Sequence, residues 1–207
     1  MNPMGDEHNV QLLQTLIDLE AEEAADQAVE EANRRLTLEG ATLRVGLVII
    51  DDLRGQWTNR YFTETSHRFN ARGETRRHWA TVCCWTSESW TQERIHQETL
   101  ASIFRVLYTQ RHGFPKRLGA MLQQEGLAMY FAHMMPPPLS ADDLDYSRDL
   151  IEPLLDTKDF PTLFGVLYGD EAARSVGYEP LGLSERAGFA VAFDMIQQSS
   201  ALPDAIL

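Results

Sequence analysis

The chain has 207 residues, a formal net charge of −13 and 43% hydrophobic residues. This length predicts one domain, and the hydrophobic content is enough for a buried core. The negative charge argues against general binding to DNA or RNA, whose phosphates attract clustered Lys and Arg. No run approaches the roughly 18 apolar residues of a membrane span, and the first residues, MNPMGDEHNV, lack the features of an export signal. We therefore expect a cytoplasmic protein with no membrane partner.

The amino-terminal part predicts one long amphipathic helix. Residues 9–38 contain no Gly or Pro and place apolar residues at helical spacing, and Gly40 is expected to end the helix. Between Asp18 and Glu31 the segment holds seven acids and no base. Such a run is usually a solvated helix face and less often a docking surface for a basic partner. Residues 1–40 are therefore interpreted as an acidic amphipathic helix.

A small mixed β-sheet is predicted for residues 43–85. Residues 43–50, LRVGLVII, are β-branched and almost continuously apolar, which predicts a strand buried on both faces. Residues 57–69, WTNRYFTETSHRF, mix aromatic, Thr and polar residues as in a half-exposed strand or ribbon. Residues 70–77 are expected to form a loop or hairpin tip. Residues 78–85, HWATVCCW, predict a further buried strand.

The two cysteines, Cys83 and Cys84, are adjacent in the predicted last strand. Neighbouring side chains of a strand point to opposite faces, so a disulfide between them would be strained. The C-x-x-C spacing typical of a metal pair is absent. Both residues are therefore expected to be free thiols.

The rest of the chain, residues 88–198, is predicted to be mainly helical. Turn and capping signals divide it, and Pro153 is expected to kink or shorten one helix. The expected helices cover residues 88–111, 116–135, 140–155 and 183–198, with a mixed segment at 160–182. An order of helix, strands and then helices predicts an α+β fold in a single domain, residues 1–207.

Three segments carry a resemblance to a known family. ETLASIFRV is followed about two dozen residues later by QQEGLAMYFA, and the pair Gly177 and Tyr178 precedes an apolar helix near the end. In this order the segments resemble a bacterial family of predicted zinc-dependent proteases of the zincin type, which is otherwise of unknown function. Its members carry T-L-A-H-E-x-x-H on one helix and E-G-L-A on the next. The resemblance covers residues 43–198 and implies a zincin-like fold.

The chemistry of that motif requires four positions. Two histidines four residues apart on a helix hold one zinc ion, a carboxylate from the next helix is a third ligand, and the Glu after the first His is the base. By the resemblance, the two histidines correspond to Ser102 and Val106, the base to Ile103 and the third ligand to Glu125. Only Glu125 is retained. The resemblance therefore implies a catalytically inactive domain without a zinc ion or other cofactor.

Other interpretations of these residues stay open. The letters EGLA are common in helices, and Gly126 could simply allow close packing against the preceding helix. A metal site rebuilt from other side chains would need histidines to converge, although His96 and Glu98 diverge on a helix. The histidines considered are His78, His96, His112 and His133.

A catalytically inactive zincin-like domain is expected to act as a binding or regulatory module. Extended peptides add to exposed sheet edges, so residues 57–69 are the candidate edge, with Trp57, Tyr61 and Phe62 as anchors for a peptide or protein partner. One alternative is an enzyme of unrecognised chemistry that uses Glu98 and Glu125, or the histidines, in the same cleft. Another is a structural or oligomer-forming protein whose acidic helix packs on a partner.

The segment from Arg60 to Arg77 combines five arginines with aromatic residues. Basic and aromatic side chains together can bind single-stranded nucleic acid or phosphate. Because the chain is acidic, we favour instead a match between these arginines and the acidic first helix, or an acidic protein partner.

Overall fold

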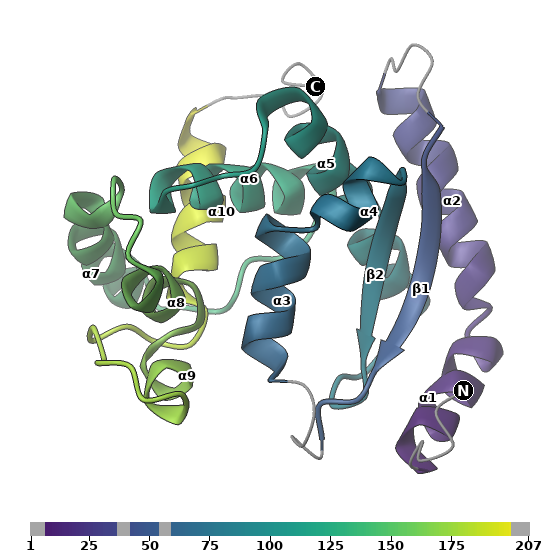
Figure 1. Ribbon diagram of the computed structural model, residues 1–207, viewed down its shortest axis with the longest axis horizontal. Helices are drawn as coiled ribbons and strands as arrows, with labels where there is room; N and C mark the ends of the chain where they lie inside the picture. The colour runs from purple at the N-terminus through teal and green to yellow at the C-terminus, as the bar shows by residue number, and fades with distance from the viewer. Residues whose placement is uncertain (1–6, 37–41, 54–58, 200–207) are drawn as a thin grey trace. The chain divides into compact units, whose positions relative to one another are not determined.

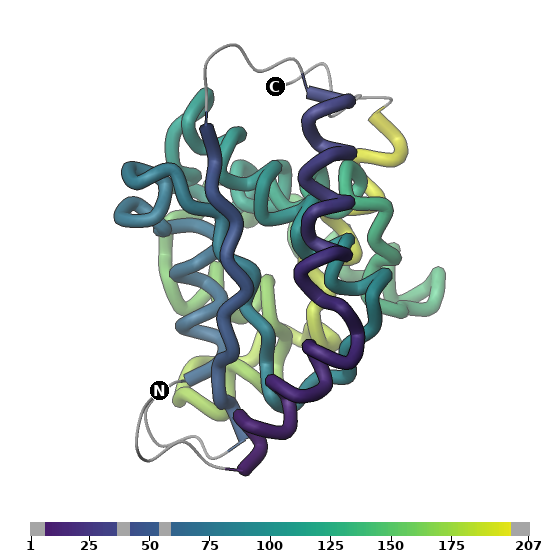
Figure 2. Tube along the Cα trace, turned by 90° about the vertical axis from the view of Figure 1, so that its right-hand side faces the viewer, coloured from purple at the N-terminus to yellow at the C-terminus, as the bar shows by residue number. Residues whose placement is uncertain are grey.

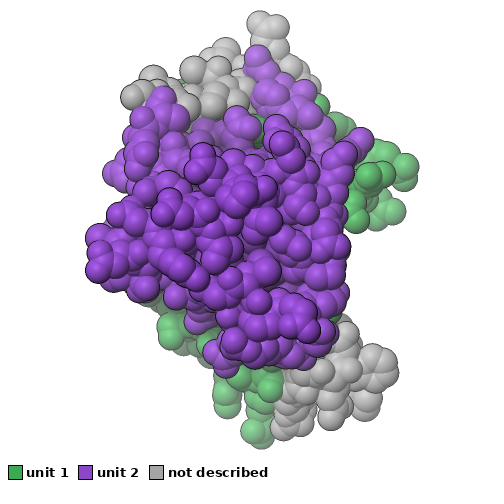
Figure 3. All heavy atoms as spheres, turned by 90° about the vertical axis from the view of Figure 1, so that its left-hand side faces the viewer, with its two compact units in different colours: residues 1–110 green, residues 111–207 purple. Residues whose placement is uncertain are grey.

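The computed structural model describes residues 7–36, 42–53 and 59–199. The chain forms two compact units, residues 1–110 and residues 111–207, which Figure 3 shows in different colours. The observed class is α+β and mostly helical, with two strands among the described residues. None of the described helices is long and apolar enough to cross a membrane.

The amino-terminal helix is broken in two, contrary to the prediction of one long helix. Helix α1 covers Glu7–Asp18 and helix α2 covers Ala21–Arg35. Between them Glu20 has a left-handed backbone, with φ at 51°. Leu16 and Ala21 would point about 140° apart on a continuous helix, so the break lets both enter one core cluster. The predicted end at Gly40 lies outside the described residues.

The sheet has two parallel strands, β1 (Arg44–Ile50) and β2 (Trp79–Trp85), rather than the mixed arrangement predicted. Arg44 pairs with Trp79, and Ile50 pairs with Trp85. Helices α1 and α2 lie on one face of the sheet and α3 on the other, as Figures 1 and 2 both show. On the α1 and α2 side, apolar residues of both strands join the core cluster.

The predicted strand at residues 57–69 is wrong, because this segment forms helix α3, Arg60–Phe69. Parallel neighbouring strands need a crossover connection, and α3 belongs to that connection. The Asn59 side chain caps the helix by accepting a hydrogen bond from the Phe62 backbone N–H. Glu64 lies between two arginines spaced four residues away on either side, which stabilises the helix against its β-forming composition. The expected loop at 70–77 contains a short helix, α4, Arg72–Arg76.

Strand β1 is not buried on both faces, which corrects the prediction from its apolar sequence. None of its seven residues is fully buried, and Val48 is 43% exposed. The reason is that β1 pairs with β2 on one side only among the described strands. Figure 2 shows β1 in front, between α2 and α3. Strand β2 alternates instead, with Ala80, Val82 and Cys84 buried.

Helix α5, Gln92–His112, follows β2 and agrees with the predicted helix at 88–111 apart from its first turn. All residues from Thr99 to Thr109 are buried. The amino-terminal part of α5 packs in the first unit, where Ile95 belongs to the core cluster. The Gln92 side chain donates a hydrogen bond to the Leu19 carbonyl oxygen at the break between α1 and α2.

The second unit is helical, as predicted. Pro153 lies in a short 3-10 helix directly after α7, so it shortens that helix. Gly177 has a left-handed backbone and Tyr178 packs edge-on against Phe164, with ring centroids 5.5 Å apart. The elements are α6 (Leu118–Phe131), α7 (Ala141–Ile151), η1 (Glu152–Leu154), α8 (Phe160–Tyr168), α9 (Asp170–Ser175) and α10 (Ala187–Ser199).

Candidate functional site

The positions that resemble the zinc motif are buried on α5. Ser102 is 8% exposed, Ile103 5% and Val106 7%. Ile103 has no proton-accepting group, and Val106 has no atom that can bind a metal. These positions therefore lack the base and the second histidine that the zinc chemistry requires.

Glu125, the third ligand position by the resemblance, lies on α6 in the second unit and is fully buried. Its carboxylate accepts a hydrogen bond from Gln124 Nε2 at 3.2 Å. The neighbouring Gly126 packs against α10, because an added Cβ would come 2.2 Å from the Ala192 carbonyl oxygen. At least the glycine of the EGLA segment thus has a role in helix packing.

The four histidines considered as ligands lie in different surroundings. His96 Nε2 lies 3.3 Å from a Glu31 carboxylate oxygen on α2. His78 and His133 are exposed residues with left-handed backbones, and His112 is exposed at the end of α5. Across the described ranges, no three side chains of His, Cys, Asp or Glu are grouped closely enough to hold a metal ion.

Both cysteines are free thiols, as predicted. Burial raises the pKa of the Cys83 thiol to about 12, although the nearby Arg68 opposes the rise. Burial likewise raises the pKa of the Cys84 thiol to about 12. A thiol is nucleophilic as its thiolate, so neither residue is suited to nucleophilic catalysis at neutral pH.

Arg60 lies at the carboxyl ends of the two strands, where open parallel sheets often bind ligands. Its Nη1 lies 3.1 Å from Asp52 Oδ2 and 2.9 Å from Ser87 Oγ, and its Nη2 contacts Glu88. Its guanidinium also lies over the Trp85 ring, 5.2 Å from the centroid. These contacts hold the ends of β1 and β2 together, so we interpret this cluster as structural.

The prediction that these arginines match the acidic first helix is wrong for Arg60. Its acidic partners are Asp52 after β1, Glu64 on α3 and Glu88 after β2. Arg68 also pairs with Glu64, at 2.9 Å. Helix α3 therefore contributes one of its own acids to this charge match.

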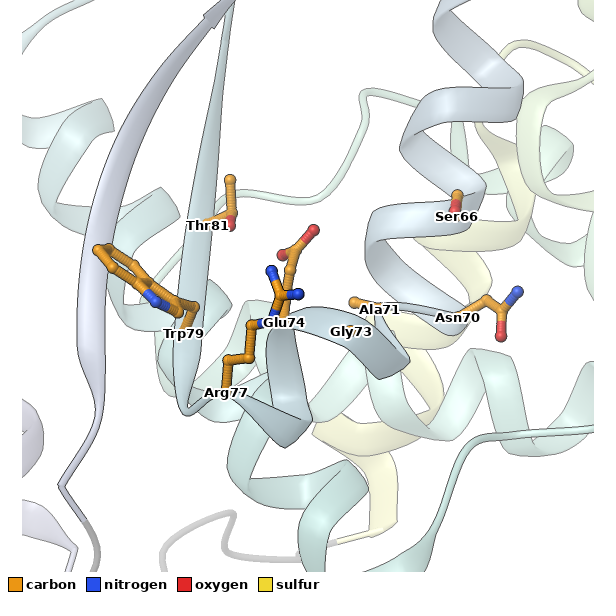
Figure 4. A pocket seen from close by; sticks show the side chains of 8 residues that line it. All are labelled: Ser66, Asn70, Ala71, Gly73, Glu74, Arg77, Trp79 and Thr81. Carbon is orange, nitrogen blue, oxygen red and sulfur yellow. The ribbon is translucent and has the colours of Figure 1, made fainter.

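A hollow of about 330 Å³ opens between α3, α4 and β2 in the first unit. In Figure 4 the side chains of Glu74 and Arg77 extend into the space between Trp79 and helix α3. Its lining residues are Ser66, Asn70, Ala71, Gly73, Glu74, Arg77, Trp79 and Thr81.

The Trp79 ring is held in place although it is 37% exposed. It lies over Gly46 of β1, where an added Cβ would come 3.2 Å from Cζ3 of the ring. The Arg44 guanidinium lies 5.9 Å from the ring centroid. Trp79 thus forms an aromatic wall of the hollow, in contact with β1.

The charges around the hollow are only partly paired. His67 Nδ1 lies 3.1 Å from Glu74 Oε1, so the acid has a neighbour. Arg76 and Arg77 are exposed, and within the described part of the chain neither forms an ion pair. The hollow therefore combines an exposed indole, two hydroxyl groups and an unpaired guanidinium.

The structure describes two of the three predicted binding residues, and their role in binding stays a prediction. Tyr61 and Phe62 lie on α3, and Phe62 is 39% exposed, but neither belongs to a sheet edge. Trp57 lies outside the described residues. Trp79, which lines the hollow, was not among the predicted residues, although it directly follows the basic residues Arg76, Arg77 and His78.

Comparison with known proteins yields one relative of note. The chain is 33% identical over 102 residues to the uncharacterized protein YjfC of Bacillus subtilis strain 168. The matched region covers 45% of this chain and 34% of that protein, so the chain spans about a third of the relative's length. No family model matches the chain, and no solved structure matches it.

Proposed function

We propose that the chain is a zincin-like domain that does not cleave peptides and instead acts as a binding or regulatory module. The observation that carries this proposal is the replacement of the base and the second histidine by Ile103 and Val106. Both side chains are buried, so solvent water does not reach them freely. A zinc protease needs an activated water at that place.

The binding role is supported by the hollow next to Trp79. Ligand sites in proteins are concave and combine apolar surface with a few placed polar groups. The Trp79 ring, the Arg77 guanidinium and the Thr81 hydroxyl provide this combination in one hollow. We assign this hollow as the recognition site of the module, in place of the predicted sheet edge with Trp57, Tyr61 and Phe62 as anchors.

Zinc content tests the first part of the proposal. The full chain would be incubated with excess zinc and desalted, and the metal measured by elemental mass spectrometry. We expect no zinc above the level of a metal-free control protein. A content near one zinc per chain would contradict the loss of the metal site.

A gain-of-ligand variant tests the zincin-like assignment itself. Ser102→His with Val106→His restores the two histidine ligands that the resemblance places four residues apart on α5. We expect this variant to retain zinc, whereas Ser102→Ala with Val106→Ala does not. Circular dichroism checks that both variants are folded. If the histidine variant is folded but retains no zinc, the zincin-like assignment is contradicted.

A second candidate function, formation of an assembly through the amino-terminal helix, is favoured by a specific observation. Val10, Leu13 and Ile17 recur at helical spacing on α1 and are 57%, 41% and 60% exposed. We propose that a partner helix covers this stripe. Light scattering of the full chain and of Val10→Ser with Ile17→Ser tests this. We expect an assembly that the variant loses, and a monomeric wild type would contradict it.

A further inference from the structure

We propose that the Trp79 hollow binds a small organic anion in which a flat ring carries a phosphate or carboxylate group. The proposal rests on the binding role proposed above and names the ligand class. The ring would pack against the exposed part of Trp79, and the oxyanion would contact Arg77.

In a protein with so many acidic residues, an arginine without an acidic partner indicates a place for an anionic ligand. Acids outnumber Lys and Arg by 31 to 18 in this chain, so an arginine on its surface has many possible acidic neighbours. Arg60, Arg94, Arg148 and Arg174 all have such partners. Arg77 lines a hollow and, among the described residues, pairs with none. An oxyanion of a ligand would fill this place, because guanidinium binds carboxylate and phosphate through parallel hydrogen bonds.

The neutral polar groups of the hollow add to this preference. Ser66 and Thr81 bring hydroxyl groups that can donate hydrogen bonds to an anion. Glu74 is the acid of the hollow, and its carboxylate lies beside His67. Arg77 and the two hydroxyl groups can therefore donate to the oxyanion, and Glu74 can accept a hydrogen bond from a hydroxyl or amino group of the ligand.

The aromatic wall explains why a bare inorganic ion is not the expected ligand. An exposed indole gains most from a flat, apolar or π-bonded surface. Gly46 is part of this arrangement, because a side chain there would push against the Trp79 ring. The volume of about 330 Å³ is near the lower end of small-molecule pockets, which span roughly 300 to 1,000 Å³. The hollow therefore has room for one small molecule.

The test follows the tryptophan indole N–H signals by NMR in the full chain labelled at its four tryptophans. Trp79→Phe identifies the Trp79 signal. The probes are adenosine monophosphate, phenyl phosphate, benzoate, adenosine and inorganic phosphate. We expect at least one ring-bearing anion to shift the Trp79 signal to saturation below about 5 mM, the range of a weak but specific site. Comparing the phosphate probes with benzoate identifies the oxyanion.

Matched variants locate the contact. Arg77→Gln is expected to weaken binding about tenfold, because it removes a charge-assisted hydrogen bond. Arg76→Gln removes the neighbouring unpaired charge, which does not line the hollow, and should change the affinity less than about twofold. Arg77→Lys should restore part of the loss. Equal effects of the two glutamine variants would overturn the assignment of Arg77.

Two other outcomes would overturn the proposal in different ways. If adenosine saturates the Trp79 signal with the same affinity as adenosine monophosphate, the phosphate group does not contribute to binding. The anion would then be wrong as a feature of the ligand class, and the binding role would be unaffected. If none of the five probes moves the signal, the ligand class is wrong. The binding role would then be tested with a set of peptides, again by measuring shifts of the Trp79 signal.

Discussion

Gly126 on α6 lies directly against the backbone of Ala192 on α10. A Cβ built on Gly126 would come 2.2 Å from the Ala192 carbonyl oxygen and 2.7 Å from Cγ1 of Ile196. Helices approach this closely only where one of them lacks a side chain. The glycine therefore sets the distance between the two helices, which cross each other in Figure 1.

The first prediction concerns this contact. Gly126→Ala should lower the free energy of unfolding by about 2 kcal/mol, because a methyl group has to push the α10 backbone away. The helix propensity of alanine offsets part of this loss. Urea denaturation of both proteins measures the difference.

The control is Gly73→Ala on α4. An added Cβ at Gly73 meets nothing within 4 Å, so this variant should stay within about 0.5 kcal/mol of the wild type. A similar loss in both variants would mean that close helix packing is not the reason for the first effect.

How far the sequence predicts this fold depends on the segment. The strands at Arg44–Ile50 and Trp79–Trp85 follow from short apolar, β-branched runs, and most helices follow from apolar periodicity. The helix at Arg60–Phe69 is not predicted by this pattern, because its Thr, Tyr and Phe residues favour strands. The Asn59 cap and the ion pairs of Glu64 with Arg60 and Arg68 stabilise the helix instead. The burial of β1 was also mispredicted, because one sequence does not state how many strands a sheet has.

The candidate site was predicted less well than the fold. The assignment of the motif positions and Glu125 comes from the resemblance and stays a prediction, whereas the chemistry of these side chains follows from residue type alone. The hollow next to Trp79 was not predicted, because it depends on the way α3 and α4 turn back toward β2. Only the register, which pairs Arg44 with Trp79 and Gly46 with Thr81, places the indole over a glycine.

The second prediction concerns the two thiols. Because burial raises the pKa of Cys83 and of Cys84 to about 12, both should react with Ellman's reagent at pH 8 on the order of a thousandfold more slowly than an exposed thiol. The rate should increase about tenfold per pH unit, since the thiolate fraction does so below the pKa. Colour development between pH 7 and 10 is the measurement, and Cys84→Ser isolates Cys83. Fast labelling of the folded protein at pH 8 would contradict the burial.

The same shift has a consequence for stability. The unfolded thiols keep their ordinary pKa and lose their protons at lower pH than the folded ones. The contribution of each thiol to stability is therefore present below its ordinary pKa and is lost as the pH rises toward about 12. Replacing both thiols by alanine should flatten the alkaline part of the stability profile, and an unchanged slope would contradict the shift.

The third prediction concerns Asp170 at the start of α9. Burial acts to raise the pKa of its carboxyl, but hydrogen bonds from the backbone N–H groups of Leu183, Leu181 and Gly182 and the charge of Arg174 outweigh it, and the net pKa is lowered. The Leu181 backbone nitrogen lies 2.8 Å from Oδ1 of Asp170. Asp170→Asn should cost about 1 to 2 kcal/mol at neutral pH, because charged acceptors bind N–H groups more strongly than an amide does.

The stability difference between the wild type and Asp170→Asn should depend on pH. A lowered native pKa contributes stability that is present above the ordinary pKa and disappears as the pH falls through the native value. The gap between wild type and Asp170→Asn should therefore be full at pH 7 and shrink below about pH 4. Thermal unfolding of both proteins across this range is the measurement. A gap that stays constant down to pH 2 would mean that the carboxylate charge is not involved.

The fourth prediction concerns Asp52 after β1. Its side chain is 3% exposed and accepts hydrogen bonds from the backbone N–H of Ser87 at 2.9 Å and from the Ser87 hydroxyl at 2.6 Å, besides the pair with Arg60. Asp52→Asn should lower the free energy of unfolding by about 2 to 3 kcal/mol, since it leaves Arg60 with less charge compensation.

The neighbouring Asp51 provides the control for this variant. Its side chain is 24% exposed, so Asp51→Asn should cost less than about 1 kcal/mol. Guanidinium titrations of the two variants give the comparison. If Asp51→Asn costs more than Asp52→Asn, the Arg60 cluster does not hold the strand ends together.

The pairing of β1 with β2 also governs the order of events during synthesis. Arg44 pairs with a residue that is 35 positions further along the chain, since its partner is Trp79. Closing a loop of this length has an entropic cost and slows folding relative to the formation of local helices. Until Trp85 has left the ribosome, the largely apolar strand β1 lacks its full partner strand β2. During this interval β1 has an unpaired edge, which favours aggregation more than the finished fold does.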